Sequence, residues 1–245
     1  MMMIKQVFAV LVVALLTTFS TVAVADEHDA SRIKQLALDA ILENPEIIAQ
    51  AITILRAQDE QRQLENVKLT LELYREELEN DPNAPVLGNP DGTIAVVEFF
   101  DYNCPYCKRV APDVLELINT DSEIKLVYRE WPILGENSVF AARAALAARE
   151  QGKYEEMHWA LMSLRQANPE TVLAAAADLG LDLQKLQTDM QSEKIDQHIG
   201  MSMQLADALG FSGTPSFVIG DQTAPGAIPL SEMREMVKNS KEANE

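Results

Sequence analysis

The chain is poor in cysteine and in basic residues, and both shortages exclude classes of protein. Its 245 residues include two cysteines, 20 lysines and arginines, and 38 aspartates and glutamates, for a formal net charge of −18. Two cysteines are too few for a disulfide scaffold or for a four-cysteine zinc site. The acidic balance leaves no basic surface for phosphate groups, which argues against nucleic-acid binding and against docking on an anionic membrane. A single cysteine pair with one chemical role stays open.

The chain also lacks an apolar run long enough to cross a bilayer, which takes roughly 20 residues. Val7 to Leu16 form an apolar run of ten residues, after a start whose one charge is Lys5 and before the pattern Ala23-Val24-Ala25. This order is typical of a cleaved secretory signal, whereas a membrane anchor would need a longer run. We therefore predict a signal peptide at residues 1–25 and export, most simply to a bacterial periplasm, without a stable membrane anchor. A close cysteine pair can form and exchange a disulfide there.

Glycine is absent from residues 31–79, and proline occurs there once, at Pro45. Ser31 can cap a first helix, and Asn44-Pro45-Glu46 is typical of a helix restart, with Asn44 as the cap. Three apolar stripes follow at helical spacing. They comprise Ile33, Leu36, Ala37, Ala40 and Ile41, then Ile48, Ala51, Ile52 and Leu55, then Leu64, Val67, Leu71, Tyr74 and Leu78.

Each of these helices has too little apolar area to be stable alone, so each must bury its stripe on another surface. That surface is either the chain's own domain or other copies of the chain. We favour a helical oligomerisation segment at residues 26–81.

Turn residues then mark a boundary, and we predict a second domain at residues 82–245. The turns are Asn80-Asp81-Pro82-Asn83 and the run from Gly88 to Gly92. Apolar runs predict strands, and helical patterns lie between and after them. The expected strands are 94–100, 124–128 and 216–219, with helices after Cys104, within 138–209 and at 230–238. The order is therefore βαβ, several helices, then ββα.

Both cysteines lie in the sequence Cys104-Pro105-Tyr106-Cys107, between a predicted strand and a predicted helix. Free amides and the helix dipole at a helix start favour a thiolate on the first cysteine. Cys104 is then the nucleophile that forms mixed disulfides, and Cys107 is the resolving thiol. A static structural disulfide is the alternative. A zinc site would need more ligands, and His28, His158 and His198 are scattered along the sequence.

The run from Glu98 to Cys107 resembles the active-site strand and helix of DsbA-like thioredoxin-fold proteins. The resemblance continues through Tyr128-Arg129-Glu130-Trp131-Pro132 and Gly213-Thr214-Pro215-Ser216-Phe217, and covers roughly residues 86–240. It implies an α/β thioredoxin fold with a helical insertion, preceded by an N-terminal helical stalk. It also implies a thiol-disulfide oxidoreductase that needs no cofactor. A glutaredoxin can share Cys-Pro-Tyr-Cys, but the signal peptide, the insertion and the stalk oppose that interpretation.

The resemblance also implies roles for site residues. Thr214 and Pro215 would form a cis-proline loop that faces the cysteines and binds substrate backbone, although Pro215 alone is also compatible with the start of an edge strand. Glu98 would be a buried acid that accepts the proton of Cys107, unless it faces outward from its strand. Pro105 and Tyr106 complete the motif. Tyr106 replaces the histidine of the most oxidising members, which implies a less oxidising couple.

With its N-terminal helices included, the chain is similar to the ScsC-like branch of this family. That branch implies a disulfide isomerase or reductase that acts on protein thiols or disulfides, works with a redox partner protein and assembles with copies of itself. A DsbA-like disulfide-donating oxidase is one alternative. A copper-binding protein is another, because Asp26-Glu27-His28 at a processed terminus can hold Cu(II), and Met201-Ser202-Met203 offers soft ligands for Cu(I).

Overall fold

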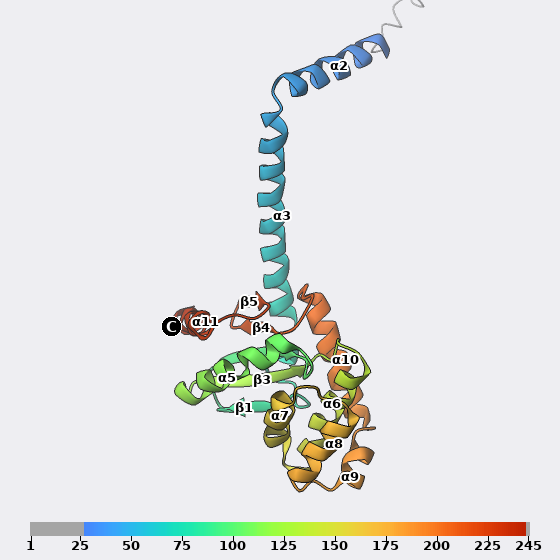
Figure 1. Ribbon diagram of the computed structural model, residues 1–245. Coiled ribbons are helices and arrows are strands. Elements are labelled where there is room, and N and C mark those ends of the chain that lie inside the picture. The colour runs from blue at the N-terminus through green and yellow to red at the C-terminus, as the bar shows by residue number, and fades with distance from the viewer. Residues whose placement is uncertain (1–26, 244–245) are drawn as a thin grey trace, which may run out of the picture. The chain divides into compact units, whose positions relative to one another are not determined.

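The computed structural model describes residues 27–243 of a chain that divides into two compact units, Met1–Gln61 and Arg62–Glu245 (Figure 1). The predicted signal peptide and Asp26 of the predicted copper motif lie outside the described residues. Within residues 27–243, no helix combines the length and the apolar character that a membrane span requires.

The first unit contains helix α2 (Glu27–Glu43) and the first part of α3 (Glu46–Leu73). The predicted restart at Asn44-Pro45 is confirmed. The predicted cap at Ser31 is wrong, since α2 begins four residues earlier and Asp29 favours the positive end of the helix. Asn44 does not cap α3 with its side chain either. Its Nδ2 atom donates a hydrogen bond back to the carbonyl oxygen of Ala40, at 3.3 Å.

Both helices of the first unit present uncovered apolar side chains. The exposed fraction reaches 69% at Leu42 and is still 43% at Ile52. The exposed residues with helical spacing are Ile33, Leu36, Leu42, Ile48, Ile52 and Leu55. The first two predicted stripes therefore lie on the surface of the chain.

The second unit is built on a five-stranded sheet with the order β1-β3-β2-β4-β5. Its strands are β1 (Val86–Gly88), β2 (Ile94–Phe100), β3 (Ile124–Glu130), β4 (Ser216–Ile219) and β5 (Gln222–Pro225). Strands β2 and β3 are parallel, and all other neighbours are antiparallel. Every residue of β2 is buried, as expected for a central strand that is covered on both faces. Sequence patterns did not indicate β1, because it is three residues long and ends in a glycine turn.

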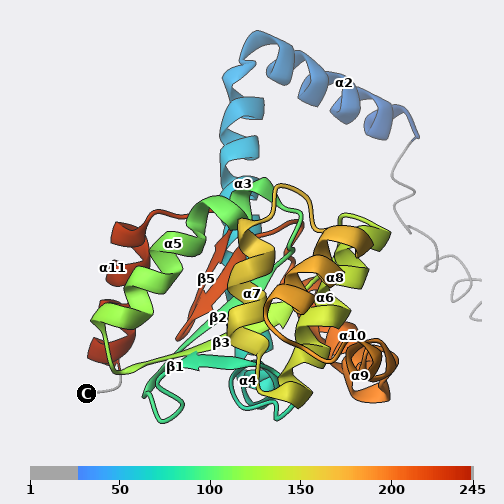
Figure 2. The same ribbon diagram turned by 60° about the horizontal axis from the view of Figure 1, so that its bottom comes forward.

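Helices cover both faces of this sheet (Figure 2). Helices α5 (Pro105–Thr120) and α11 (Leu230–Ala243) contact each other on one face. The larger core lies there, where Val96, Phe100 and Tyr128 point. The other face packs Val97, Phe99 and Val127 against the end of α3, α4 (Arg75–Glu79) and α10 (Glu193–Ala208). The remaining elements of the insertion between β3 and β4 are α6 (Glu136–Ala148), the 3-10 turn η1 (Arg149–Gln151), α7 (Tyr154–Ser163), α8 (Pro169–Asp178) and α9 (Leu183–Asp189).

The third predicted stripe packs on this body from Val67 onward, but not at Leu64. Leu71 and Leu78 are 2% and 1% exposed in the second core, while Leu64 is 66% exposed. Arg129 of β3 is fully buried, and its Nη1 donates to the Asp81 carboxylate at 2.7 Å, which ties the loop after α4 to the sheet. Packing on the chain's own domain thus accounts for Leu71 and Leu78. The functional boundary between residues 81 and 82 stays a prediction.

The topology confirms the predicted α/β thioredoxin fold with its helical insertion and preceding helices. The order βαβ, insertion, ββα is present, and the antiparallel strands β4 and β5 flank Gly220 and Asp221. The active-site turn leaves the carboxyl end of β2, in the middle of the sheet.

Candidate active site

The turn between β2 and α5 positions the first cysteine. Asp101 is buried, and its carboxylate accepts hydrogen bonds from the amides of Asn103 at 2.7 Å and Leu134 at 3.0 Å. Its carbonyl oxygen accepts the amide of Cys104 at 3.0 Å. Cys104 is then the N-cap of α5, and Pro105 occupies the first turn, where it needs no amide partner. The structure therefore places both cysteines at the start of a helix, as predicted.

Cys104 carries an acidified thiol. The residue is 4% exposed, and its pKa is lowered to about 5. The largest cause is the hydrogen bond from the Cys107 thiol, which outweighs the opposing effect of burial. Thr214 and the backbone amides of Tyr106 and Cys107 lower this pKa further. The free amides at the helix start thus favour the Cys104 thiolate, as predicted.

Cys107 is fully buried and is held as a neutral thiol. Burial raises its pKa, and the hydrogen bond to Cys104 and the nearby charge of Glu98 raise it further. The two cysteines are three residues apart in one helical turn, yet their environments push their pKa values in opposite directions. This difference in pKa lets one thiol act as the nucleophile while the other keeps its proton.

Glu98 lies inside the fold, so the outward-facing alternative is wrong. It is 2% exposed in the middle of β2, opposite Tyr128 in β3 and Phe217 in β4. Burial, and to a smaller extent the charge of Cys104, raises its pKa to about 8. The carboxyl is thus coupled electrostatically to both cysteines.

The loop before β4 closes the site. The peptide bond between Thr214 and Pro215 is cis, and the Cys104 Sγ atom lies 3.2 Å from the Thr214 carbonyl oxygen. Pro215 does not begin an edge strand, because β4 starts at Ser216 and pairs with β2 on one side and β5 on the other. The structure brings Cys104, Cys107, Glu98 and Thr214 together.

Pro105 and Tyr106 lie on the outside of the same turn. Both are exposed, and Tyr106 is 52% exposed. The Arg109 guanidinium lies 5.1 Å from the centre of the Tyr106 ring, which is a cation–π contact. Pro105 and Tyr106 are therefore exposed surface residues that directly follow the buried Cys104.

The comparisons with known proteins agree with this geometry. A family model described as DSBA-like thioredoxin domain matches residues 95–238, which is more than half of the chain. The chain belongs to this family. A second model, described as the copper resistance protein ScsC N-terminal domain, matches residues 29–62 of this DsbA-like chain.

Solved structures of similar proteins include a thioredoxin-like oxidoreductase from Silicibacter pomeroyi DSS-3. It is 56% identical, with a TM-score of 0.68, and the match covers 69% of this chain and 98% of that one. Proteus mirabilis ScsC in a transitional conformation is 26% identical, with a TM-score of 0.65, and is matched over 88% of this chain and 98% of its own.

Among curated proteins, a Na(+)/H(+) antiporter NhaA 3 from Salinispora tropica is 30% identical over 63% of this chain. The match covers only 24% of the length of that antiporter. The DsbA-like chain thus spans about a quarter of the length of such curated relatives.

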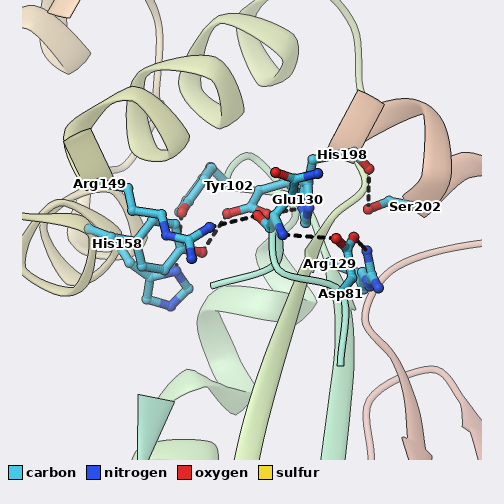
Figure 3. A network of polar contacts seen from close by, with 10 residues as sticks. Asp81, Tyr102, Arg129, Glu130, Arg149, His158, His198 and Ser202 are labelled. Atoms are coloured by element: carbon cyan, nitrogen blue, oxygen red, sulfur yellow. Dashed lines mark hydrogen bonds and ion pairs between the residues drawn. The ribbon is translucent and has the colours of Figure 1, made fainter. Parts of the chain in front are cut away.

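The DsbA-like domain also contains a buried polar network that sequence reasoning missed (Figure 3). The carboxylate of Glu130, at the end of β3, contacts His198 Nε2 at 2.6 Å and accepts a hydrogen bond from the Tyr154 hydroxyl. The Tyr102 hydroxyl lies 3.1 Å from His158 Nδ1, and burial lowers the pKa of His158 to about 3. The sequence feature that could have indicated a buried role for Glu130 is the position of this acid at the end of a mostly apolar strand.

The two histidines looked scattered because they are 40 positions apart, but α7 and α10 bring both of them to the end of β3. The network therefore joins the active-site turn, through Tyr102, to the helical insertion. Beside it, Arg149 donates to the carbonyl oxygens of Asn83 at 2.9 Å and Pro82 at 3.0 Å.

The predicted copper ligands of the DsbA-like domain do not converge. Met201 packs partly buried against the second core, whereas Met203 is 44% exposed. Residues two apart on a helix point to different sides, so Met201 and Met203 are not a ligand pair. Within residues 27–243, no group of three histidine, cysteine, aspartate or glutamate side chains is arranged to hold a metal ion.

Proposed function

We propose that the chain is an exported thiol-disulfide oxidoreductase that reduces and isomerises disulfides in periplasmic proteins. The observation that carries the proposal is the Cys104 thiol, whose pKa is lowered to about 5. At neutral pH this thiol is a thiolate, the form that attacks disulfides, and Thr214 and Pro215 lie beside it to bind substrate backbone.

The reaction starts with attack of the Cys104 thiolate on one sulfur of a substrate disulfide. A new bond forms between Cys104 and that sulfur, the substrate disulfide breaks, and the second substrate sulfur leaves as a thiolate. Cys107 then loses its proton and attacks Cys104, which releases the first substrate sulfur. The substrate gains two electrons, and the Cys104–Cys107 pair becomes a disulfide.

Glu98 is the group that takes the Cys107 proton. While Cys104 is a thiolate, its charge raises the pKa values of both Glu98 and Cys107, and the carboxyl stays largely protonated at pH 7. In the mixed disulfide Cys104 is neutral. The part of each upward pKa shift that the Cys104 charge causes is then absent, so that Glu98 ionises more readily and can accept the proton when Cys107 must attack.

Assembly through the N-terminal helices favours isomerisation. The exposed stripe of Ile48, Ile52 and Leu55, together with the match of residues 29–62 to the ScsC N-terminal domain, supports contact between copies of the chain. Several active sites around one substrate allow a wrong disulfide to be attacked repeatedly before the substrate leaves.

A disulfide-donating oxidase is the second candidate, and the same low pKa of Cys104 favours it. A stabilised thiolate stabilises the reduced protein and makes its disulfide a stronger oxidant. Tyr106 in place of histidine argues in the other direction. A redox partner that keeps the pair reduced would select the isomerase, and one that keeps it oxidised would select the oxidase.

The experiment compares the full chain with an Ile48→Gln, Ile52→Gln variant, and uses Gln50→Ala on the opposite face of α3 as the control. We expect the double variant to become monomeric and to lose isomerisation of a scrambled protein, while it still reduces a single-disulfide peptide. Oxidation of reduced substrates that exceeds isomerisation in the unchanged chain would favour the oxidase. A monomeric unchanged chain with full isomerase activity would contradict the role of assembly.

A further inference from the structure

The loop between α7 and α8 is tied to the active-site helix at both ends. Lys108 donates to the carbonyl oxygen of Leu164. Asn103 donates to the carbonyl oxygen of Ala167 at 3.0 Å and accepts the amide of Ala167 at 2.8 Å. Because Asn103 directly precedes Cys104, these bonds hold the intervening Arg165 and Gln166 beside the reactive turn.

A hollow of about 380 Å³ opens at this place, lined by Asn103, Leu134, Asn137, Arg165 and Gln166. The lining contains a guanidinium and three amides but no carboxylate. The amide of Asn103 is occupied by Ser138 and Ala167, whereas no hydrogen bond within residues 27–243 engages the side chains of Asn137 or Gln166. The hollow therefore offers free donors and one positive charge.

Arg165 is unusual among the arginines of the second unit of this acidic protein. Its side chain is exposed and makes no ion pair or hydrogen bond within the part of the chain that the structure describes. Four other arginines of the second unit pair with carboxylates, namely Arg75, Arg129, Arg143 and Arg234. Arg149 donates to carbonyl oxygens. Arg109 is occupied by the Tyr106 ring.

The chain contains 38 acidic and 20 basic residues, so carboxylates that could pair with an arginine are plentiful. The unpaired state of Arg165 is therefore not caused by a shortage of acids. Arg165 lies in a loop that is bonded to the turn before the reactive cysteine, in a hollow whose lining contains no acid. A guanidinium there is available for an external carboxylate, which it can bind with two parallel hydrogen bonds.

We propose that this hollow is a subsite for an acidic side chain of the polypeptide substrate, with Arg165 as the residue that selects it. The inference rests on the proposed function and adds to it a substrate class: cysteines with an aspartate or glutamate nearby in the sequence. Asn137 and Gln166 contribute amide donors to the same carboxylate or to the adjacent backbone.

The test measures kcat/KM for release of thiopyridine from extended peptides whose single cysteine is protected as a thiopyridine disulfide. Glutamate or glutamine occupies each neighbouring position in turn. For the unchanged chain we expect a preference for one glutamate peptide of about fivefold, the range of a partly exposed charge pair. Arg165→Gln should bring the ratio close to one, and Arg165→Lys should retain part of it because the charge remains.

Arg234→Gln is the matched control, since it removes the same charge from the distant helix α11 and should keep the preference. An equal ratio in the unchanged chain and in Arg165→Gln would overturn the subsite, as would equal losses in both variants. A slower reaction with every peptide, together with a raised pKa of Cys104, would show that Arg165 acts on the thiolate and would also overturn it. If the unchanged chain reacts with all peptides equally, only the subsite fails; if it reacts with none, the proposed function fails, and the subsite with it.

Discussion

The sulfur of Cys104 lies 3.2 Å from the carbonyl oxygen of Thr214, although the two residues are 110 positions apart in the chain. The sheet creates this contact, because β2 leads into Cys104 and its antiparallel neighbour β4 follows directly after Pro215. The same strand β2 carries Glu98 beneath the cysteines. One central strand and its neighbour thus assemble the nucleophile, the acid and the substrate-facing loop.

The first prediction concerns the cause of the low Cys104 pKa. The Cys107 thiol donates the hydrogen bond with the largest effect, so Cys107→Ala should raise the pKa of Cys104 from about 5 by at least about 1 pH unit. Cys107→Ser keeps a donor and should leave the value closer to that of the unchanged chain. Thiolate absorbance against pH measures both. Equal pKa values in the alanine and serine variants would assign the acidification to the helix start alone.

The second prediction concerns pH and stability through Glu98. Its pKa is raised to about 8 from 4.5, so folding favours the protonated form. The contribution of Glu98 to the stability of the reduced protein should therefore fall as pH rises from about 4.5 through 8, whereas Glu98→Gln has no such carboxyl to ionise. The difference in free energy of unfolding between them should grow across that window, by at most about 5 kcal/mol.

Denaturant unfolding of the reduced protein at pH 5 and pH 9 measures this difference. The oxidised protein is the control, and it should show a smaller effect because Cys104 then has no charge to raise the Glu98 pKa. A difference that does not change with pH would mean that Glu98 is ionised throughout.

The third prediction separates two leucines of one helical stripe. Leu78 is 1% exposed in the second core, and Leu78→Ala should lower the free energy of unfolding by about 2–5 kcal/mol. Leu64 is 66% exposed, and Leu64→Ala should change it by less than about 0.5 kcal/mol. Similar losses in the two variants would mean that Leu64 is covered in solution, as contact with a second copy would do.

The fourth prediction concerns the buried pair of Glu130 and His198, whose carboxylate and Nε2 atoms are 2.6 Å apart. Glu130→Ala should cost about 3–5 kcal/mol of unfolding free energy, because it leaves a buried histidine and the Tyr154 hydroxyl without their partner. Glu116→Ala is the control, since its pair with Arg234 is exposed and worth less than about 1 kcal/mol. Chemical denaturation compares them; a cost at Glu130 no larger than at Glu116 would contradict the structural role of the network.

The strands and the cysteine turn could be predicted from the sequence because they depend on local patterns. Ile94 to Phe100 is an unbroken apolar run, and the motif from Cys104 to Cys107 begins a helix whose physics follows from its first turn. The inward position of Glu98 followed from the family resemblance and from an acid within an apolar run.

Other features depend on packing between distant segments. The meeting of His198 with Glu130, 68 positions away, requires the path of the whole insertion, and no local pattern encodes that path. Leu64 and Leu71 belong to one sequence stripe, yet only Leu71 meets the sheet, because burial depends on where the helix reaches the body. The unpaired state of Arg165 likewise becomes visible only when every potential partner has a position.

The most direct test of the central claim is to trap the mixed disulfide. Cys107→Ala and Cys104→Ala variants are each incubated at pH 7 with a single-disulfide peptide, and the adducts are identified by mass spectrometry. A Cys104 thiolate that attacks first predicts rapid, stoichiometric attachment of the peptide to Cys104 in Cys107→Ala and almost none in Cys104→Ala. Equal attachment rates in the two variants, or attachment to Cys107 alone, would contradict the account.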